Sequence, residues 1–167
     1  MDYLLDSNIF IQAKNIQYPF DVFPGFWELL KKDMFSGLIH SIDPVYKELM
    51  KGDDELKVWI SKYKDTDCFL KVEDTATQNA YKEIARWASS PKLNYTETAK
   101  SVFLSAADSW LIAKAVVNKC SIVTLEKYDP FIKKRIKIPN ACMEFNVNCI
   151  NTIDLLRDMK AKFILTS

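Results

Sequence analysis

Short runs of apolar residues alternate along the chain with longer stretches in which apolar positions recur at helical spacing. The short runs predict strands, and the amphipathic stretches predict helices. Predicted strands cover residues 3–5, 37–42, 120–124 and 147–150, and residues 69–72 form a further candidate. Predicted helices cover residues 7–14, 26–35, 43–52, 73–88, 96–104, 107–118 and 152–159, with one more capped by Asp53 or Asp54. This alternation indicates an α/β fold with a central, mainly parallel sheet of four to five strands covered on both faces.

Composition points to a single globular unit. Hydrophobic residues make up 49% of the 167 residues, which is enough for a sizeable core. The chain has only three glycines and six prolines, with no internal repeat and no low-complexity stretch, so the sequence contains little material for a flexible linker. We therefore expect one domain spanning residues 1–167.

Cysteine and histidine usage argues against several kinds of site. The four cysteines form no C-x-x-C pair, and His40, expected at a strand end, is the only histidine. A structural zinc site and a histidine-dependent nucleophilic mechanism are therefore disfavoured. No apolar run approaches the ~20 residues that span a bilayer, and the N-terminus lacks the features of a signal peptide. These observations predict a cytoplasmic protein with reduced thiols and no membrane contact.

Charge is nearly balanced overall but uneven along the chain. The formal net charge is only +1, so no global basic excess marks a nucleic-acid binder. Residues 119–137 contain six basic and two acidic side chains, whereas residues 43–74 contain nine acidic and six basic ones. A nearly neutral protein with this distribution can present a basic face beside an acidic pocket.

Asp6 ends the first predicted strand, within the segment Leu-Leu-Asp-Ser-Asn. A strand that stops at a carboxylate delivers it to the carboxyl edge of the sheet, where open α/β folds place their ligand sites. An acid beside apolar residues is costly to hold ionised unless a cation offsets its charge. The simpler alternative is that Asp6 or Ser7 only caps the following helix.

Three more carboxylates occupy comparable positions, each with its own simpler alternative. Glu48 lies in the helix after the second strand, where a solvated helix residue is the alternative. Asp108 is the only acid between Lys100 and Cys120, in a mostly apolar helix that it could also cap. Glu126 follows the third predicted strand, or else belongs to a surface loop.

Together the four acids predict a metal site. Converging carboxylates raise one another's pKa unless a cation neutralises them. Oxygen ligands without histidine or thiolate suit Mg²⁺ or Mn²⁺ better than zinc. Such a cation can orient and deprotonate water and stabilise the charge of a phosphodiester during cleavage. Asn8 and Thr124 could hold the ligating acids by hydrogen bonds.

The order of these motifs resembles that of the PIN-domain nuclease superfamily over nearly the whole chain. The resemblance rests on Leu-Leu-Asp-Ser-Asn at residues 4–8, an acid in the helix after the second strand, Ala-Asp-Ser-Trp-Leu-Ile-Ala at residues 107–113 and Val-Thr-x-Glu at residues 123–126. It looks closest to an uncharacterised branch with distinctive segments at residues 18–27 and 138–142. The resemblance implies a compact three-layer α/β/α sandwich. It also implies a metal-dependent ribonuclease directed at single strands, which leaves 5′-phosphate and 3′-hydroxyl ends and is often the toxin of a bacterial toxin–antitoxin pair.

The resemblance carries the family's acidic positions onto Asp6, Glu48 and Asp108, which are expected to bind one or two Mg²⁺ or Mn²⁺ ions. Glu126 stands where the family usually has a fourth acid, an Asp, and Asp129 is the alternative for that position. The small polar residues that support the metal in the family correspond to Ser7, Asn8 and Thr124.

Basic and aromatic side chains are candidates for nucleic-acid contacts. Cations that bind phosphates supply affinity without sequence information, and the candidates are Lys14, Lys114, Lys133, Lys134 and Arg135. An ordinary solvated charge run is the alternative for residues 133–137. The aromatic segment 18–27 could stack on bases, although helix and loop packing or a homodimer interface is favoured for it.

The sequence thus predicts a Mg²⁺- or Mn²⁺-dependent endoribonuclease, with RNA and a cognate antitoxin protein as its candidate partners. One alternative is that the same site acts on DNA or on structured junctions. The other is a PIN-like protein without activity that only binds a partner. Carboxylates at all four acidic positions argue against this last reading.

Overall fold

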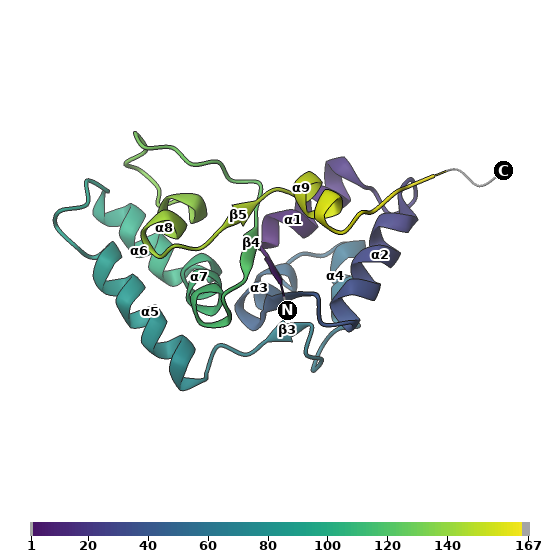
Figure 1. Ribbon diagram of the computed structural model, residues 1–167, viewed down its shortest axis with the longest axis horizontal. Coiled ribbons are helices and arrows are strands. Elements are labelled where there is room, and N and C mark those ends of the chain that lie inside the picture. The colour runs from purple at the N-terminus through teal and green to yellow at the C-terminus, as the bar shows by residue number, and fades with distance from the viewer. Residues whose placement is uncertain (1, 165–167) are drawn as a thin grey trace.

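The computed structural model describes residues 2–164 and confirms the predicted α/β architecture (Figure 1). Within these residues, five parallel strands form one sheet in the order β3-β2-β1-β4-β5. Their bounds are β1 Tyr3–Leu5, β2 Ile39–Ile42, β3 Phe69–Leu70, β4 Ser121–Val123 and β5 Cys149–Ile150. Every predicted strand is present, including the candidate near residue 70, and all but the first are shorter than predicted.

Helices cover both faces of the sheet. They are α1 Ser7–Gln12, the π-helical η1 Ala13–Gln17, α2 Pro24–Phe35, α3 Asp43–Leu49, α4 Glu55–Ser61, α5 Thr75–Ala88, α6 Glu97–Ser105, α7 Ala107–Asn118, α8 Ile138–Glu144 and α9 Thr152–Asp158. Figure 1 shows α5, α6, α7 and α8 on one side of the strands and α1, α2, α4 and α9 on the other. The sheet is therefore the middle of three layers, as predicted. None of the helices within residues 2–164 is long and apolar enough to cross a membrane.

Several local features differ from the sequence-based expectation, among them the helix predicted over residues 43–52, which ends at Leu49. The helix α8 is not predicted, because seven residues are too few to show a clear apolar period. The first helix does not end at Lys14 but continues as a π-helical turn to Gln17. The second strand begins two residues late because Gly37 adopts a left-handed backbone, with φ of 78°, in the turn before it.

The sequence suggested that His40 lies at a strand end. In the structure it lies within β2. Its Nδ1 lies 2.7 Å from the Asp67 carbonyl oxygen and its Nε2 lies 3.1 Å from that of Gly37. Both ring nitrogens thus contact backbone carbonyls of the segments that lead into β2 and β3.

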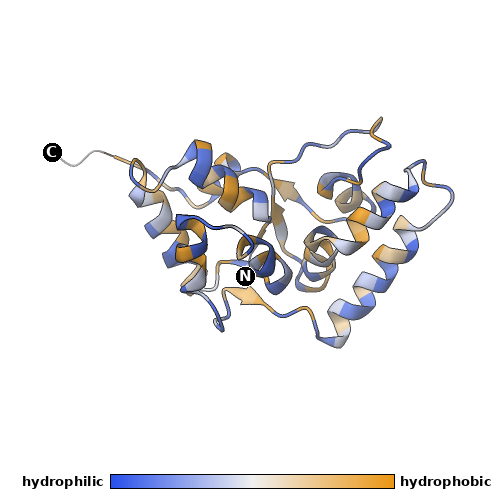
Figure 2. Cartoon of the chain, turned by 180° about the vertical axis from the view of Figure 1, so that it is seen from behind, coloured by the Kyte–Doolittle hydropathy of each residue, from blue (hydrophilic) through white to orange (hydrophobic). Residues whose placement is uncertain are grey.

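The helix α7 is the centre of the apolar core. It packs against α5, α6, α8, α3 and the strands β2 and β4. Leu111, Ile112 and Ala113 are fully buried on it, and their neighbours include the fully buried Ile122 of β4. Figure 2 shows the hydrophobic strands at the centre of the chain, between helices of mixed character. Because α7 is fixed on several sides, its first turn is a rigid platform for a functional side chain.

The aromatic segment before and within α2 packs against itself. Tyr18 stacks on Phe26 with ring centroids 4.2 Å apart, and Phe20 stacks on Trp27 at 4.0 Å. Trp27 is only 2% exposed and donates a hydrogen bond from Nε1 to the Tyr18 carbonyl oxygen at 2.7 Å. These rings therefore stabilise the fold, which is the packing role favoured from the sequence.

Replacement of Ile112 by Ala tests the central position of α7. The side chain is fully buried, so its truncation should lower the free energy of unfolding by about 2–5 kcal/mol. Urea unfolding followed by circular dichroism measures the change. The control is Val102→Ala on α6, where the side chain is 57% exposed and a change within about 0.5 kcal/mol is expected. Equal losses in the two variants would contradict this account of the core.

Candidate active site

The strands β1 and β4 end side by side and place Asp6 and Thr124 next to each other. The chain builds β2 and β3 on one side of β1, then β4 and β5 on the other, so the strand order reverses between β1 and β4. Ligand sites in open α/β sheets lie at the carboxyl ends of such a switch point. The Asp6 amide donates to the Val123 carbonyl oxygen at 3.0 Å, which fixes the two strand ends to each other.

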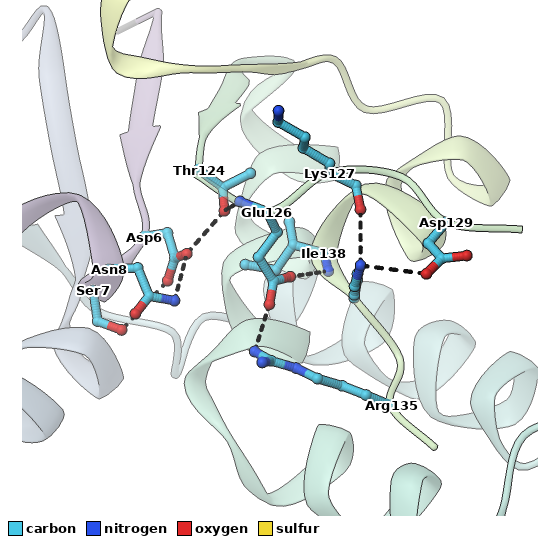
Figure 3. Close-up of polar contacts among 10 residues, drawn as sticks. Asp6, Ser7, Asn8, Thr124, Glu126, Lys127, Asp129, Arg135 and Ile138 are labelled. Carbon is cyan, nitrogen blue, oxygen red and sulfur yellow. Dashed lines mark hydrogen bonds and ion pairs between the residues drawn. The ribbon is translucent and has the colours of Figure 1, made fainter. Parts of the chain in front are cut away.

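Asp6 is almost completely buried, with 1% of its surface exposed. The Thr124 hydroxyl donates to its Oδ2 at 2.9 Å, and the Asn8 amide donates to the same oxygen at 3.4 Å. The Ser7 hydroxyl donates to Oδ1 at 3.3 Å (Figure 3). Asp6 occupies the N-cap position of α1, yet its side chain makes no capping hydrogen bond there. Its environment is thus that of an oriented carboxylate, surrounded by the three small polar residues singled out from the sequence.

Glu48 connects α3 to the start of α7. Its Oε1 accepts a hydrogen bond of 3.1 Å from the backbone amide of Ala107, the first residue of α7. A carboxylate at this end of a helix satisfies a free amide and interacts favourably with the helix dipole. Glu48 is therefore not a solvated helix residue. It is Glu48, and not Asp108, that provides the observed capping bond, while Asp108 lies in the first turn.

Glu126 has the same relation to α8. Its Oε2 accepts a 2.7 Å hydrogen bond from the amide of Ile138, the first residue of that helix. Its Oε1 pairs with the guanidinium of Arg135, and only 9% of the Glu126 side chain is exposed. The Glu126 side chain is thus largely buried, and each of its two carboxylate oxygens has a partner. The alternative of a free surface-loop Glu does not describe it.

Asp129, the alternative fourth acid, points to a different part of the loop (Figure 3). Its Oδ1 accepts from the Phe131 amide at 3.0 Å, and its Oδ2 pairs with Lys137 at 3.6 Å. These local contacts explain its position through loop geometry alone. The geometry therefore favours Glu126 over Asp129 as the neighbour of the other acids.

Asp6, Glu48, Asp108 and Glu126 form one electrostatic group, which we call the acid cluster. Burial raises the pKa of Asp108 to about 7, and the charges of Asp6, Glu126 and Glu48 add to this effect, in that order, while Arg135 opposes it. Burial also raises the pKa of Asp6, with a further contribution from Glu126, although the Thr124 hydrogen bond works in the opposite direction. Mutual repulsion of this kind is what a bound cation relieves.

The acid cluster has the donor chemistry for a hard divalent cation, because all its donors are carboxylate oxygens. Among the described residues, however, no three acidic, histidine or cysteine side chains are already grouped closely enough to hold an ion. Glu126 is engaged with Arg135 and Ile138, and Glu48 with Ala107. The residues thus fit a cation by charge and by chemical type, and their present contacts compete with it.

The five predicted phosphate-binding cations fall into three groups. Lys14 pairs with Asp54 at 3.1 Å, and Lys114 pairs with Asp74 at 2.7 Å, so both charges are partly neutralised. Arg135 faces the acid cluster. The remaining two, Lys133 and Lys134, are exposed on the loop between β4 and α8.

The contact of Glu126 with the Ile138 amide had no signal in the sequence, because α8 itself was not predicted.

The fold is an open α/β sheet of parallel strands, with Asp6 at the carboxyl end of β1 at its switch point. The chain belongs to the family described as Domain of unknown function (DUF4411), whose model matches residues 3–163. Among solved structures, the fold is similar to a chain in the crystal structure of VapBC2 from Rickettsia felis bound to a DNA fragment from their promoter. The TM-score is 0.55 at 14% sequence identity, over 90% of this chain and 98% of that chain. No curated protein matches. The structural likeness establishes the fold, and the chemistry has to be argued from the side chains.

The raised pKa of Asp108, about 7, predicts how stability depends on pH. An unfolded aspartate releases its proton near pH 4, whereas folded Asp108 keeps it to about pH 7. Folded wild type should therefore lose stability as the pH rises from 4 to 7. Asp108→Asn removes this loss, so in metal-free buffer at pH 8 the variant should be more stable than wild type by on the order of 2–4 kcal/mol.

The measurement is chemical unfolding of wild type and Asp108→Asn at pH 4 and pH 8 in a chelating buffer. The stabilisation by Asn should be small at pH 4 and large at pH 8. Asp53→Asn is the control, because the Asp53 side chain is fully exposed and no pH-dependent gain is expected. A gain for Asp108→Asn that is the same at both pH values would contradict the proposed repulsion.

Proposed function

We propose that this protein is a divalent-metal-dependent endoribonuclease that hydrolyses phosphodiester bonds of single-stranded RNA. The observation that carries the proposal is the convergence of Asp6, Glu48, Asp108 and Glu126 at the switch point of the sheet, where burial, with added repulsion from the other acids, raises the pKa of Asp108 to about 7. The bonds of Glu48 and Glu126 to helix amides account for those two side chains, but they give no reason to place Asp6 and Asp108 beside them. The PIN-like fold and the resemblance of the sequence motifs support the same reading.

The residues of the acid cluster have distinct parts in this proposal. The buried Asp6 and the partly buried Asp108 would hold Mg²⁺ or Mn²⁺, with Glu48 and Glu126 completing the set. When bound, such a cation activates water as a nucleophile and offsets the charge that develops on the phosphodiester. Thr124, with Ser7 and Asn8, orients Asp6 by hydrogen bonds. The single histidine, His40, contacts backbone carbonyls within the sheet and supplies no general base.

The biological setting that we propose is a bacterial toxin–antitoxin pair in the cytoplasm. The resemblance of the motifs to the PIN-domain superfamily supports it, as does the fold shared with the VapBC2 structure. An antitoxin could inhibit the enzyme by placing a basic side chain among the acids. Arg135 already makes such a contact with Glu126 from within the chain, so the acid cluster accepts a guanidinium.

The proposal is tested by Asp108→Asn, which removes one negative charge and leaves the shape of the side chain nearly unchanged. With Mg²⁺ or Mn²⁺, cleavage of a labelled single-stranded RNA should fall by about a hundredfold or more, since even residues that only support a metal ligand contribute about 10- to 100-fold. Asp129→Asn is the matched control in the same assay and should retain activity, because the Asp129 carboxylate bonds the Phe131 amide and Lys137 and none of the other acids.

Equal cleavage rates for Asp108→Asn and wild type would falsify the assignment of the site. A strand of DNA with the same sequence, tested beside the RNA, decides between the two nucleic acids. Faster cleavage of DNA would replace the ribonuclease proposal by the DNA-directed alternative.

The second candidate is a PIN-like module that binds a partner without catalysis. The observation in its favour is that both Glu126 oxygens are already occupied, by Arg135 and by the Ile138 amide. Calorimetric titration with Mn²⁺ distinguishes the two candidates. Binding that is lost in Asp108→Asn supports the enzyme, and a wild-type protein that takes up no Mn²⁺ supports the module.

Arg135→Gln should change metal and RNA binding in opposite directions. Without the guanidinium, Glu126 is released and the local potential becomes more negative, so the Kd for Mn²⁺ should fall by about fivefold. Affinity for RNA should decrease, because the negative charge of Glu126 is no longer offset and repels the phosphates. Calorimetry with Mn²⁺ and fluorescence anisotropy with RNA measure the two effects. Lys133→Gln is the control: Lys133 is exposed on the same loop, and its loss should weaken only RNA binding.

A further inference from the structure

A cleft of about 600 Å³ adjoins the acid cluster at the carboxyl ends of β4 and β5. Its volume lies within the roughly 300–1,000 Å³ that is typical of small-molecule sites. Thr124 and Glu126 line the cleft and also belong to the site described above. A polymer whose phosphate lies at the acid cluster therefore has this cleft as its immediate continuation.

Three segments that are distant in sequence form the walls of the cleft. Lys127 and Tyr128 come from the loop after β4, Arg157 comes from α9, and Gln17 ends η1. In Figure 1 the loop after β4 and the helix α9 lie on opposite sides of β5. The convergence is thus a product of the tertiary fold, and local sequence patterns carry no signal for it.

The exposed side chains of the cleft match the chemistry of a nucleotide. Tyr128 is 49% exposed, and no ring among the described residues stacks on it. Lys127 forms no ion pair within residues 2–164, and Figure 3 shows its amine directed away from Glu126. An open aromatic face beside a free cation is the combination that binds single-stranded nucleic acid.

The acidic residues of the cleft have cationic or amide partners, which weakens their repulsion of a phosphate. Asp154 accepts from Arg157 at 3.2 Å and from the Asn151 amide group at 2.6 Å. Glu126 is paired with Arg135. The charge left without a partner on this wall is that of Lys127, the residue next to Glu126 in the chain, so a strand that crosses Glu126 meets a cation directly afterwards.

We propose that this cleft binds the nucleotide adjacent to the scissile phosphate, with its base stacked on Tyr128 and its outer phosphate at Lys127. The inference rests on the proposed nuclease function and extends it by a defined substrate subsite. Stacking uses the face of a base and tolerates any sequence. The subsite therefore positions the strand across the acid cluster without selecting a particular base.

The test is binding of a short fluorescein-labelled single-stranded RNA in EDTA, followed by anisotropy, so that no cleavage occurs. Tyr128→Ala should weaken binding by roughly tenfold or more, the loss typical of one stacked base. Tyr128→Phe should bind nearly as wild type, because the ring face is kept. The matched control is Phe131→Ala, since Phe131 is 86% exposed on the same loop but does not line the cleft.

The subsite is overturned if Tyr128→Ala binds as wild type, or if Phe131→Ala weakens binding as strongly. In cleavage assays Tyr128→Ala should raise KM much more than it lowers kcat, because the acid cluster is untouched. A single-stranded DNA probe is run in parallel, and dependence of its binding on Tyr128 also supports a base-stacking cleft. Binding in EDTA and cleavage by Asp108→Asn are separate measurements, so the subsite and the nuclease proposal can fail independently.

Discussion

Burial of carboxylates close to one another is the constraint around which the candidate site is built. Asp6 and Asp108 are both held where burial disfavours their charge, and each carboxylate makes ionisation of the next more costly. The fold tolerates this cost because hydrogen bonds orient Asp6 and because Arg135 lies beside Glu126. A cation that enters this arrangement would offset the negative charges and so bind favourably. The same physical feature therefore links the stability of the fold to the proposed activity.

Two members of the acid cluster also serve the architecture. Glu48 accepts a hydrogen bond from the first amide of α7, and Glu126 accepts one from the first amide of α8. Each acid therefore caps the N-terminus of a helix to which it does not belong. These bonds hold the side chains of Glu48 and Glu126 in place through backbone amides. They also mean that a ligand competing for Glu126 has to displace contacts of the loop between β4 and α8. Ligand binding and the order of that loop are consequently coupled.

The acid cluster and the adjoining cleft both lie at the carboxyl edge of the sheet, at its switch point. Because the strand order reverses between β1 and β4, the loops that leave these strands diverge and create space at their carboxyl ends. The acid cluster lies at this place, and the cleft with Tyr128 and Lys127 continues from it beside β5. A reaction centre and a surface for the adjoining part of a polymer thus arise from the same topological feature.

The sequence alone determined the fold class, the strands and most helices, because apolar periodicity and capping residues such as Asp54 are local signals. It also placed Asp6 directly after the first strand, where the structure has it. Only the tertiary structure decided that Glu126 and not Asp129 acts on the other acids, that α8 exists, and that Tyr128 and Arg157 line the same cleft. Those outcomes depend on contacts between segments far apart in the chain. Local periodicity carries no information about such contacts.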